Sequence, residues 1–188
     1  IINADVGVAP DGTTTAYKII PNTDALGLSG TQDGHYLTKT ITSSSSTWSV
    51  YAKPAGFNYI NLILQRSQTN SQGVQFNIST GVVVTSQNAT GTITDAGNGW
   101  YRCSIVPNDT NSSQYKQFQP NDGTTPDTSN YFRSNSTTDG TSGVLVWGAQ
   151  LESTALTGYL PTTSASLSGI TGVTRGVSGT TAATASSG

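Results

Sequence analysis

Few side chains in this sequence could take part in chemistry. The 188 residues include one cysteine, Cys103, one histidine, His35, and one glutamate, Glu152, while the other nine acidic residues are aspartates. One cysteine and one histidine cannot build an internal disulfide or a Cys- or His-based metal cluster, and the common nucleophile and phosphate-binding motifs are absent from the sequence. A glycoside hydrolase needs two paired carboxylates, but most of the aspartates stand in turn sequences, where a carboxylate binds nearby main chain. The sequence therefore predicts a protein that is not an enzyme.

Asparagine and aspartate in the polar loops are the candidates for binding a metal ion. Ca²⁺ takes six to eight oxygen ligands, and Asp109 with Asn108 and Asn111, or Asp122 with Asn121, would supply some of them. Neither group has the spacing of a known calcium loop, so ordinary polar loops are the favoured interpretation. We expect no cofactor, with a structural calcium ion as the alternative.

Aromatic side chains could instead bind a glycan or a protein. A sandwich that recognises sugars usually presents exposed rings beside hydrogen-bonding groups, whereas exposed rings also serve protein interfaces. Strand alternation predicts that Trp48 and Trp147 point into the core. The aromatic residues expected at the surface, as possible glycan or partner contacts, are Tyr51, Tyr115, Tyr131 and Phe132.

The composition restricts the class of partner. Charged residues make up 10% of the chain, where soluble domains average about a quarter, and the formal net charge is −2. No cluster of Lys and Arg is present to attract nucleic acid or an anionic membrane surface. No apolar stretch approaches the ~20 residues that a membrane-spanning helix needs. We expect neither nucleic acid nor membrane as a partner.

The residue types favour β-structure over helices. The chain contains 24 Ser, 31 Thr and 21 Gly, which are weaker helix formers than Ala, Leu, Glu and Lys. Short runs of β-branched and aromatic residues recur between turn residues, a pattern typical of an antiparallel sandwich. The expected strands are 14–20, 35–42, 47–53, 59–66, 74–78, 82–85, 91–94, 100–106 and 143–151, with weaker candidates at 114–118 and around Tyr131.

Alternation within the strands predicts the core. Successive side chains of a strand point to opposite faces, so every second residue of a half-buried strand is expected inside. Cys103 falls on such a face and is predicted to be a small buried residue without a reactive role. The expected core faces are Trp48, Val50 and Ala52; Tyr101, Cys103 and Ile105; and Leu145, Trp147, Ala149 and Leu151, with Trp100 in the same core motif.

The chain is expected to divide into a sandwich, residues 1–163, and a tail, residues 164–188. The tail is dominated by Ser, Thr, Gly and Ala and has too little apolar surface to fold alone, so we expect an arm or linker that orders against a partner. The sequence opens with Ile1 and contains no Met, which predicts that an N-terminal part is missing or processed.

Several sequence blocks together resemble one family. They are APDGTTTAYKI at 9–19, TWSVYAKPAG at 47–56, GNGWYRCSI at 97–105, VLVWGAQLE at 144–152 and a Thr-x-Tyr-x-Pro-Thr segment at 157–162. This order of blocks is similar to the jelly-roll modules, lectin-like or carbohydrate-binding-like, of tailed-phage virion proteins. The resemblance implies an all-β, antiparallel jelly-roll β-sandwich, here followed by a low-complexity C-terminal arm. The family usually has one more strand, with a Trp, before the first block, and its absence here agrees with a truncated or processed start.

The resemblance also implies a function and a pair of structural residues. It predicts a non-enzymatic structural or attachment component of a virion, outside the cell, whose partners are other virion proteins and copies of itself. The alternative is a module that recognises glycans on the host surface. Arg102 and Glu152 belong to the two most specific blocks, and on neighbouring strands they would form a bidentate pair that holds the sandwich together.

Overall fold

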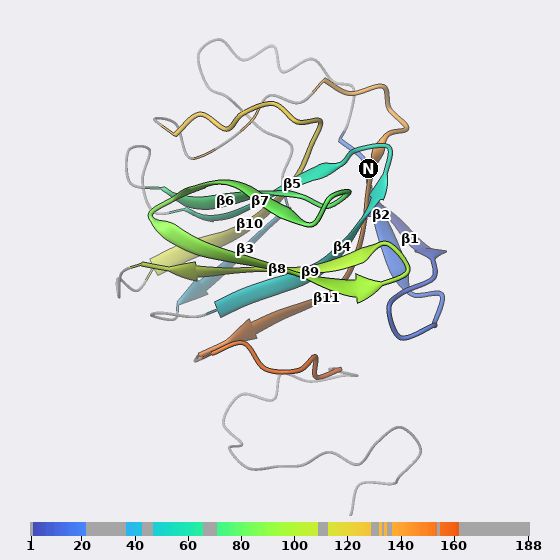
Figure 1. Ribbon diagram of the computed structural model, residues 1–188, viewed down its shortest axis with the longest axis horizontal. Coiled ribbons are helices and arrows are strands. Elements are labelled where there is room, and N and C mark those ends of the chain that lie inside the picture. Colours follow the sequence, from blue (N-terminus) through green and yellow to red (C-terminus); the bar gives the residue numbers. More distant parts are fainter. Residues whose placement is uncertain are drawn as a thin grey trace, which may run out of the picture.

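The computed structural model describes residues 2–21, 37–42, 47–65, 71–108, 113–128, 132, 134, 137–153 and 155–161. These residues form eleven β-strands and no helix, so none of them belongs to a helix that could cross a membrane (Figure 1). The strands are β1 (Ile2–Gly7), β2 (Ala16–Ile19), β3 (Leu37–Thr42), β4 (Thr47–Ala55), β5 (Tyr59–Gln65), β6 (Gln72–Asn77), β7 (Val82–Gln87), β8 (Ala89–Gly97), β9 (Trp100–Pro107), β10 (Ser113–Asn121) and β11 (Gly143–Glu152).

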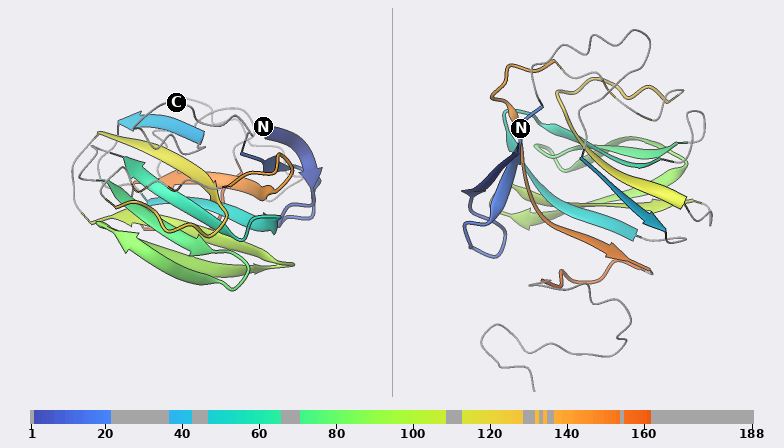
Figure 2. Two further views of the ribbon diagram at one scale, coloured as in Figure 1. Left: turned by 90° about the horizontal axis from the view of Figure 1, so that it is seen from above. Right: turned by 180° about the vertical axis from the view of Figure 1, so that it is seen from behind.

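The strands make two antiparallel sheets that pack against each other as a sandwich (Figure 2). The six-stranded sheet has the order β1-β2-β11-β4-β9-β8, and the five-stranded sheet has the order β3-β10-β5-β6-β7. In chain order, β2 and β11, then β3 and β10, then β4 and β9 pair alternately in one sheet and the other. This is the path of a long hairpin rolled into a barrel-like sandwich, the jelly roll. The predicted fold class is confirmed.

The predicted strands are present, with two differences. All nine strong predictions fall on strands, and the weaker candidate at 114–118 belongs to the nine-residue strand β10. No strand includes Phe132 or Ser134, the described residues near Tyr131. The second difference is an additional strand, since β1 precedes the first block and pairs with β2 at one end of the six-stranded sheet. It contains no Trp, and the missing N-terminal part stays a prediction. The predicted arm, 164–188, lies outside the described residues.

The core between the two sheets contains most of the predicted inward faces. Trp48, Val50 and Ala52 are buried there, and Cys103 and Ile105 lie beside them on the neighbouring strand β9. Burial raises the pKa of the Cys103 thiol far above its usual range, because the thiolate would lose its hydration. The cysteine is therefore a core residue, as the alternation predicts.

The predicted core face of β11 is right for Leu151 but wrong for Leu145, Trp147 and the exposed Ala149, because the strand contains a bulge. The pairing of β11 with β4 shifts between Trp147 and Gln150, and Gly148 takes a φ of 59° there. Before the bulge Val144 and Val146 face the core between the sheets, while Leu145 and Trp147 join a second cluster. After the bulge Leu151 faces the core. A bulge adds one residue and reverses the alternation, which a simple period of two does not anticipate.

The second cluster lies on the outer face of the six-stranded sheet. Its centre is Trp100, which is buried against Ala9 and Ala16 and not between the sheets. The indole Nε1 of Trp100 donates to the carbonyl of Val8 at 3.1 Å. The N-terminal loop therefore covers this part of the outer face, and its main chain satisfies the buried indole.

Candidate functional site

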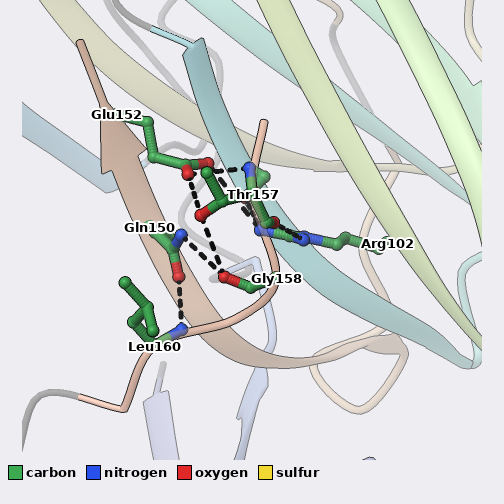
Figure 3. A network of polar contacts seen from close by, with 7 residues as sticks. Arg102, Gln150, Glu152, Thr157, Gly158 and Leu160 are labelled. Carbon is green, nitrogen blue, oxygen red and sulfur yellow. Dashed lines mark hydrogen bonds and ion pairs between the residues drawn. The ribbon is translucent and has the colours of Figure 1, made fainter. Parts of the chain in front are cut away.

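The segment that follows β11 turns back across the outer face of the six-stranded sheet. Residues 155–161 lie on the side of β11 that faces away from the five-stranded sheet (Figure 1). Side chains from two strands hold this segment, as Figure 3 shows. We call the arrangement the clamp and define it by Arg102 of β9, Gln150 and Glu152 of β11, and the segment 157–160.

The charged side chains of the clamp bind one residue of the segment. Arg102 donates from Nη1 to the carbonyl oxygen of Thr157. Glu152 accepts at Oε1 from the main-chain N–H of Thr157 at 2.8 Å and from its hydroxyl. The positive charge of Arg102 thus binds the acceptor of Thr157, and the negative charge of Glu152 binds its donors. Such charge-assisted hydrogen bonds are stronger than those between neutral groups.

Gln150 binds the segment further along. Its Nε2 donates to the carbonyl of Gly158 at 3.3 Å, and its Oε1 accepts from the N–H of Leu160 at 2.9 Å. One amide side chain therefore satisfies two main-chain groups, much as a neighbouring strand would. The segment is held through its backbone, so its path is fixed from Thr157 to Leu160.

Arg102 and Glu152 lie together, but not as the predicted bidentate pair on neighbouring strands. Their nearest ion contact, from Nη2 to Oε2, is 3.9 Å, and each side chain is only 11% exposed. Strand β4 lies between β9 and β11, and Nη2 also donates to Ser49 Oγ of β4 at 3.1 Å. The guanidinium thus reaches across β4, and its Nη1 binds the carbonyl of Thr157. The ion pair with Glu152 is therefore a single, long contact from Nη2.

Three aromatic rings complete the attachment of the segment. Tyr51 and Trp147 are register partners on β4 and β11, with ring centroids 5.4 Å apart, and Tyr159 packs on both at 5.9 and 4.3 Å. The guanidinium carbon of Arg102 lies 5.4 Å from the centre of the Tyr51 ring, within cation–π range. Burial, together with the negative charge of Asp11, raises the pKa of Tyr159, so its hydroxyl is neutral at physiological pH.

The two predicted surface aromatics whose side chains the structure describes, Tyr51 and Phe132, lie on opposite outer faces of the sandwich. Tyr51 is half-buried beneath Tyr159 and Arg102, and Phe132 is completely buried, so its predicted exposure is wrong. Phe132 packs into the space above Gly73, where even a Cβ atom would clash with its ring. The side chain of Tyr115 and the whole of Tyr131 lie outside the described residues.

Sequence reasoning does not predict Thr157, Gln150 or Tyr159 as members of this site. Tyr159 and Gln150 both belong to the sequence blocks of the family resemblance, yet neither was singled out. The signal available was the Thr-x-Tyr-x-Pro-Thr segment itself, because a tyrosine just after the last strand needs an apolar surface on which to pack. Its partner ring, Trp147, was predicted to be inside.

The outer face of the five-stranded sheet is covered in a different way. Amide side chains lie side by side on β5, β6 and β10, where Gln119, Asn61 and Gln75 are register partners. Gln119 donates from Nε2 to the carbonyl of Ser134 and accepts from its N–H, at 2.7 and 3.1 Å. Gln75 donates to the carbonyl of Thr124 at 2.9 Å. We call this the amide face; it binds the main chain of the connection between β10 and β11.

The calcium candidates are engaged by protein donors where the structure describes them. Asp122 accepts at Oδ1 from the N–H of Thr124 and at Oδ2 from the N–H of Thr137. Burial alone would raise the pKa of Asp122, but the hydrogen bonds from these threonines outweigh it and lower the pKa. The described residues contain no group of three His, Cys, Asp or Glu side chains that could hold a metal ion. Asp109 and Asn111 lie outside the described residues.

Comparisons with models of protein families and with curated proteins found no match for this chain. The structure shows a jelly-roll sandwich in which the clamp binds residues 157–160 to the outer face of the six-stranded sheet.

Proposed function

We propose that this protein is a non-enzymatic structural or attachment component of a tailed-bacteriophage particle. It would act as a capsid decoration, head fibre or tail module, through contacts with other virion proteins and with copies of itself. The proposal depends on the sequence blocks that resemble phage virion modules. The protein would be located in the extracellular virus particle.

One observation carries the proposal: the blocks that carry the resemblance meet at the clamp. Arg102 comes from the block at 97–105, Glu152 from the block at 144–152, and Thr157 from the segment that follows them. The clamp fixes the path of residues 157–160, which come shortly before the Ser- and Thr-rich sequence 162–188. If the low-complexity residues 164–188 act as the predicted arm, a fixed segment just before them would suit an assembled particle in which the arm contacts a neighbour.

The chemistry of the described residues agrees with a role in contacts. The only cysteine is buried with a raised pKa, and the carboxylates with resolved shifts, Asp11, Asp122 and Asp139, have lowered pKa values. A general acid needs a carboxyl whose pKa is raised toward neutrality, and these carboxylates bind turn residues instead.

Mass spectrometry and cross-linking of purified particles test the proposal. We expect the protein at a fixed copy number in every particle preparation, with cross-links to other particle proteins. Its absence from purified particles, or its recovery at variable trace amounts, would overturn the assignment.

A glycan-recognition module remains the second candidate, because Tyr51, Trp147 and Tyr159 gather on one outer face. It ranks lower, since the rings pack on one another at interplanar angles of 65° and 85° around Tyr51 and do not form a flat platform. Calorimetric titration with host polysaccharide separates the two roles: saturable binding weakened by Trp147→Ala would favour glycan recognition. Release of reducing ends during the same incubation would indicate catalysis, which we do not expect.

A further inference from the structure

The four edge strands of the sandwich differ in how they are protected. An edge strand presents unpaired main-chain N–H and C=O groups, and proteins commonly protect such edges with charged residues. The sequences of β1, β3 and β8 each contain one charged residue, namely Asp5, Lys39 and Asp95. The remaining edge, β7, has the sequence VVVTSQ and contains neither a charge nor a proline.

Strand β7 also exposes apolar side chains beside the edge with which no other described strand pairs. Val82 and Val84 are 51% and 49% exposed, while Val83 between them packs against the core. The pairing of β7 with β6 shifts between Gln75 and Phe76, so Val84 is the extra residue of a bulge. A bulge is one protective device, but here it leaves a second valine at the surface.

Hydrogen bonds anchor β7 at both ends. Asn77 accepts at Oδ1 from the N–H groups of Ser79 and Thr80, which closes the turn between β6 and β7. At the other end of the strand, Gln87 donates to the carbonyl of Thr128 at 2.8 Å. A strand that is ordered before binding loses little conformational entropy when a partner strand pairs with it.

We propose that β7 pairs with β7 of a second copy of this chain, antiparallel and around a two-fold axis. Two copies of an uncharged strand can face each other without like-charge repulsion, and antiparallel pairing presents the same edge to itself. The pairing joins two five-stranded sheets and covers Val82 and Val84 of both copies. The inference rests on the proposed role in protein contacts and names one of its partners.

Analytical ultracentrifugation of the full chain over a range of concentrations tests the pairing. We expect the protein to self-associate and Val84→Lys to weaken association at least tenfold, because it places two like charges beside the axis. Thr92→Lys is the matched control, since it adds the same charge at an exposed position on another edge strand, β8, and we expect association to be unchanged.

Two results would overturn the pairing: a protein that stays monomeric at every concentration, or association that Val84→Lys and Thr92→Lys leave equally intact. Circular dichroism establishes that the variants are folded. If Val84→Lys does not fold, Val84→Thr keeps the β-propensity and removes the apolar contact, and it should also weaken association. The measurement uses the purified chain alone, so its failure is distinct from a failure to find the protein in particles.

Discussion

The two outer faces of the sandwich are both covered by later parts of the chain, but with different chemistry. On the six-stranded sheet, the clamp uses a charged pair and three aromatic rings to hold residues 157–160. On the five-stranded sheet, the amide face uses neutral side chains and the buried ring of Phe132 to hold the connection before β11. In both, side chains of the sheet bind main-chain groups of the cover.

The difference lies in burial. Asn61, Gln119 and Asn121 of the amide face are at most 1% exposed, and Phe132 is fully buried, so this cover behaves as part of the core. Gln150 of the clamp is only half-buried, and Leu160 is 56% exposed. A hydrogen bond lost from a dry site leaves an unsatisfied partner, whereas water replaces one lost near the surface. The amide face and the mostly buried pair Arg102 and Glu152 should therefore support the fold, whereas Gln150 should mainly position the segment 158–160.

The largest effect is expected from Phe132→Ala. Removing a fully buried ring leaves a cavity above Gly73, and Phe-to-Ala changes in cores cost about 3–5 kcal/mol of unfolding free energy. Urea denaturation monitored by tryptophan fluorescence measures the loss. Phe132→Leu, which keeps much of the volume, should lose less. A loss under about 1 kcal/mol for the alanine variant would show that this cover is not part of the core.

Glu152→Ala should have the next largest effect. The change leaves Arg102 mostly buried without its carboxylate, and breaking a buried ion pair from one side costs about 3 kcal/mol. It also removes the acceptor for the N–H of Thr157. Thermal denaturation and limited proteolysis measure the two consequences, and cleavage within 155–161 should become faster.

Glu152→Gln is the control, since it keeps an oxygen acceptor for Thr157 and loses only the charge. An unchanged melting temperature in Glu152→Ala would contradict a structural role for the pair. Faster cleavage at 155–161 in Phe132→Ala than in Glu152→Ala would contradict the assigned role of the clamp. It would mean that the cover of the five-stranded sheet, and not the clamp on the six-stranded sheet, holds the segment 155–161 in place.

The sequence predicted the sandwich because strand periodicity is local. Runs such as 47–53 and 100–106 show their alternation directly, and their inward residues are in the core. Alternation fails in β11 because of the bulge at Gly148. The strand sequence does not show the extra residue, which becomes visible only in the pairing with β4.

The candidate site was predictable only in part. Arg102 and Glu152 came from family resemblance, but their separation by β4 depends on strand order, which no local pattern encodes. Phe132 lies outside any strand, so alternation says nothing about its burial, and Gly73, which receives it, is 59 positions earlier in the numbering. Main-chain partners of side chains such as Gln119 are equally non-local.

A matched pair of glutamines sharpens the comparison. Gln119 and Gln150 each donate to one main-chain carbonyl and accept from one main-chain N–H of the cover that they hold. Gln119→Ala should cost about 2 kcal/mol because the buried main-chain N–H and carbonyl of Ser134 lose this partner, while Gln150→Ala should cost about 0.5 kcal/mol because water can reach its partners. Urea denaturation of both variants under the same conditions compares their losses of unfolding free energy. Equal losses would mean that the cover of the amide face is no better shielded from water than the segment held by the clamp.

The smallest effect concerns acid. Hydrogen bonds from Thr13 lower the pKa of Asp11 in the N-terminal loop, and hydrogen bonds from Thr124 and Thr137 lower that of Asp122 despite its partial burial. A carboxylate whose folded pKa lies below its unfolded value of about 3.9 stabilises the fold above that pH, and the contribution is lost as pH falls through the folded pKa. Asp11 binds only a neighbour two residues away, whereas Asp122 joins its turn to Thr137. Asp122→Asn should therefore flatten the loss of stability between about pH 4 and pH 2 more than Asp11→Asn does, as measured by urea midpoints across that range. A larger change in Asp11→Asn would mean that the N-terminal cover, and not the connection before β11, is the acid-sensitive one.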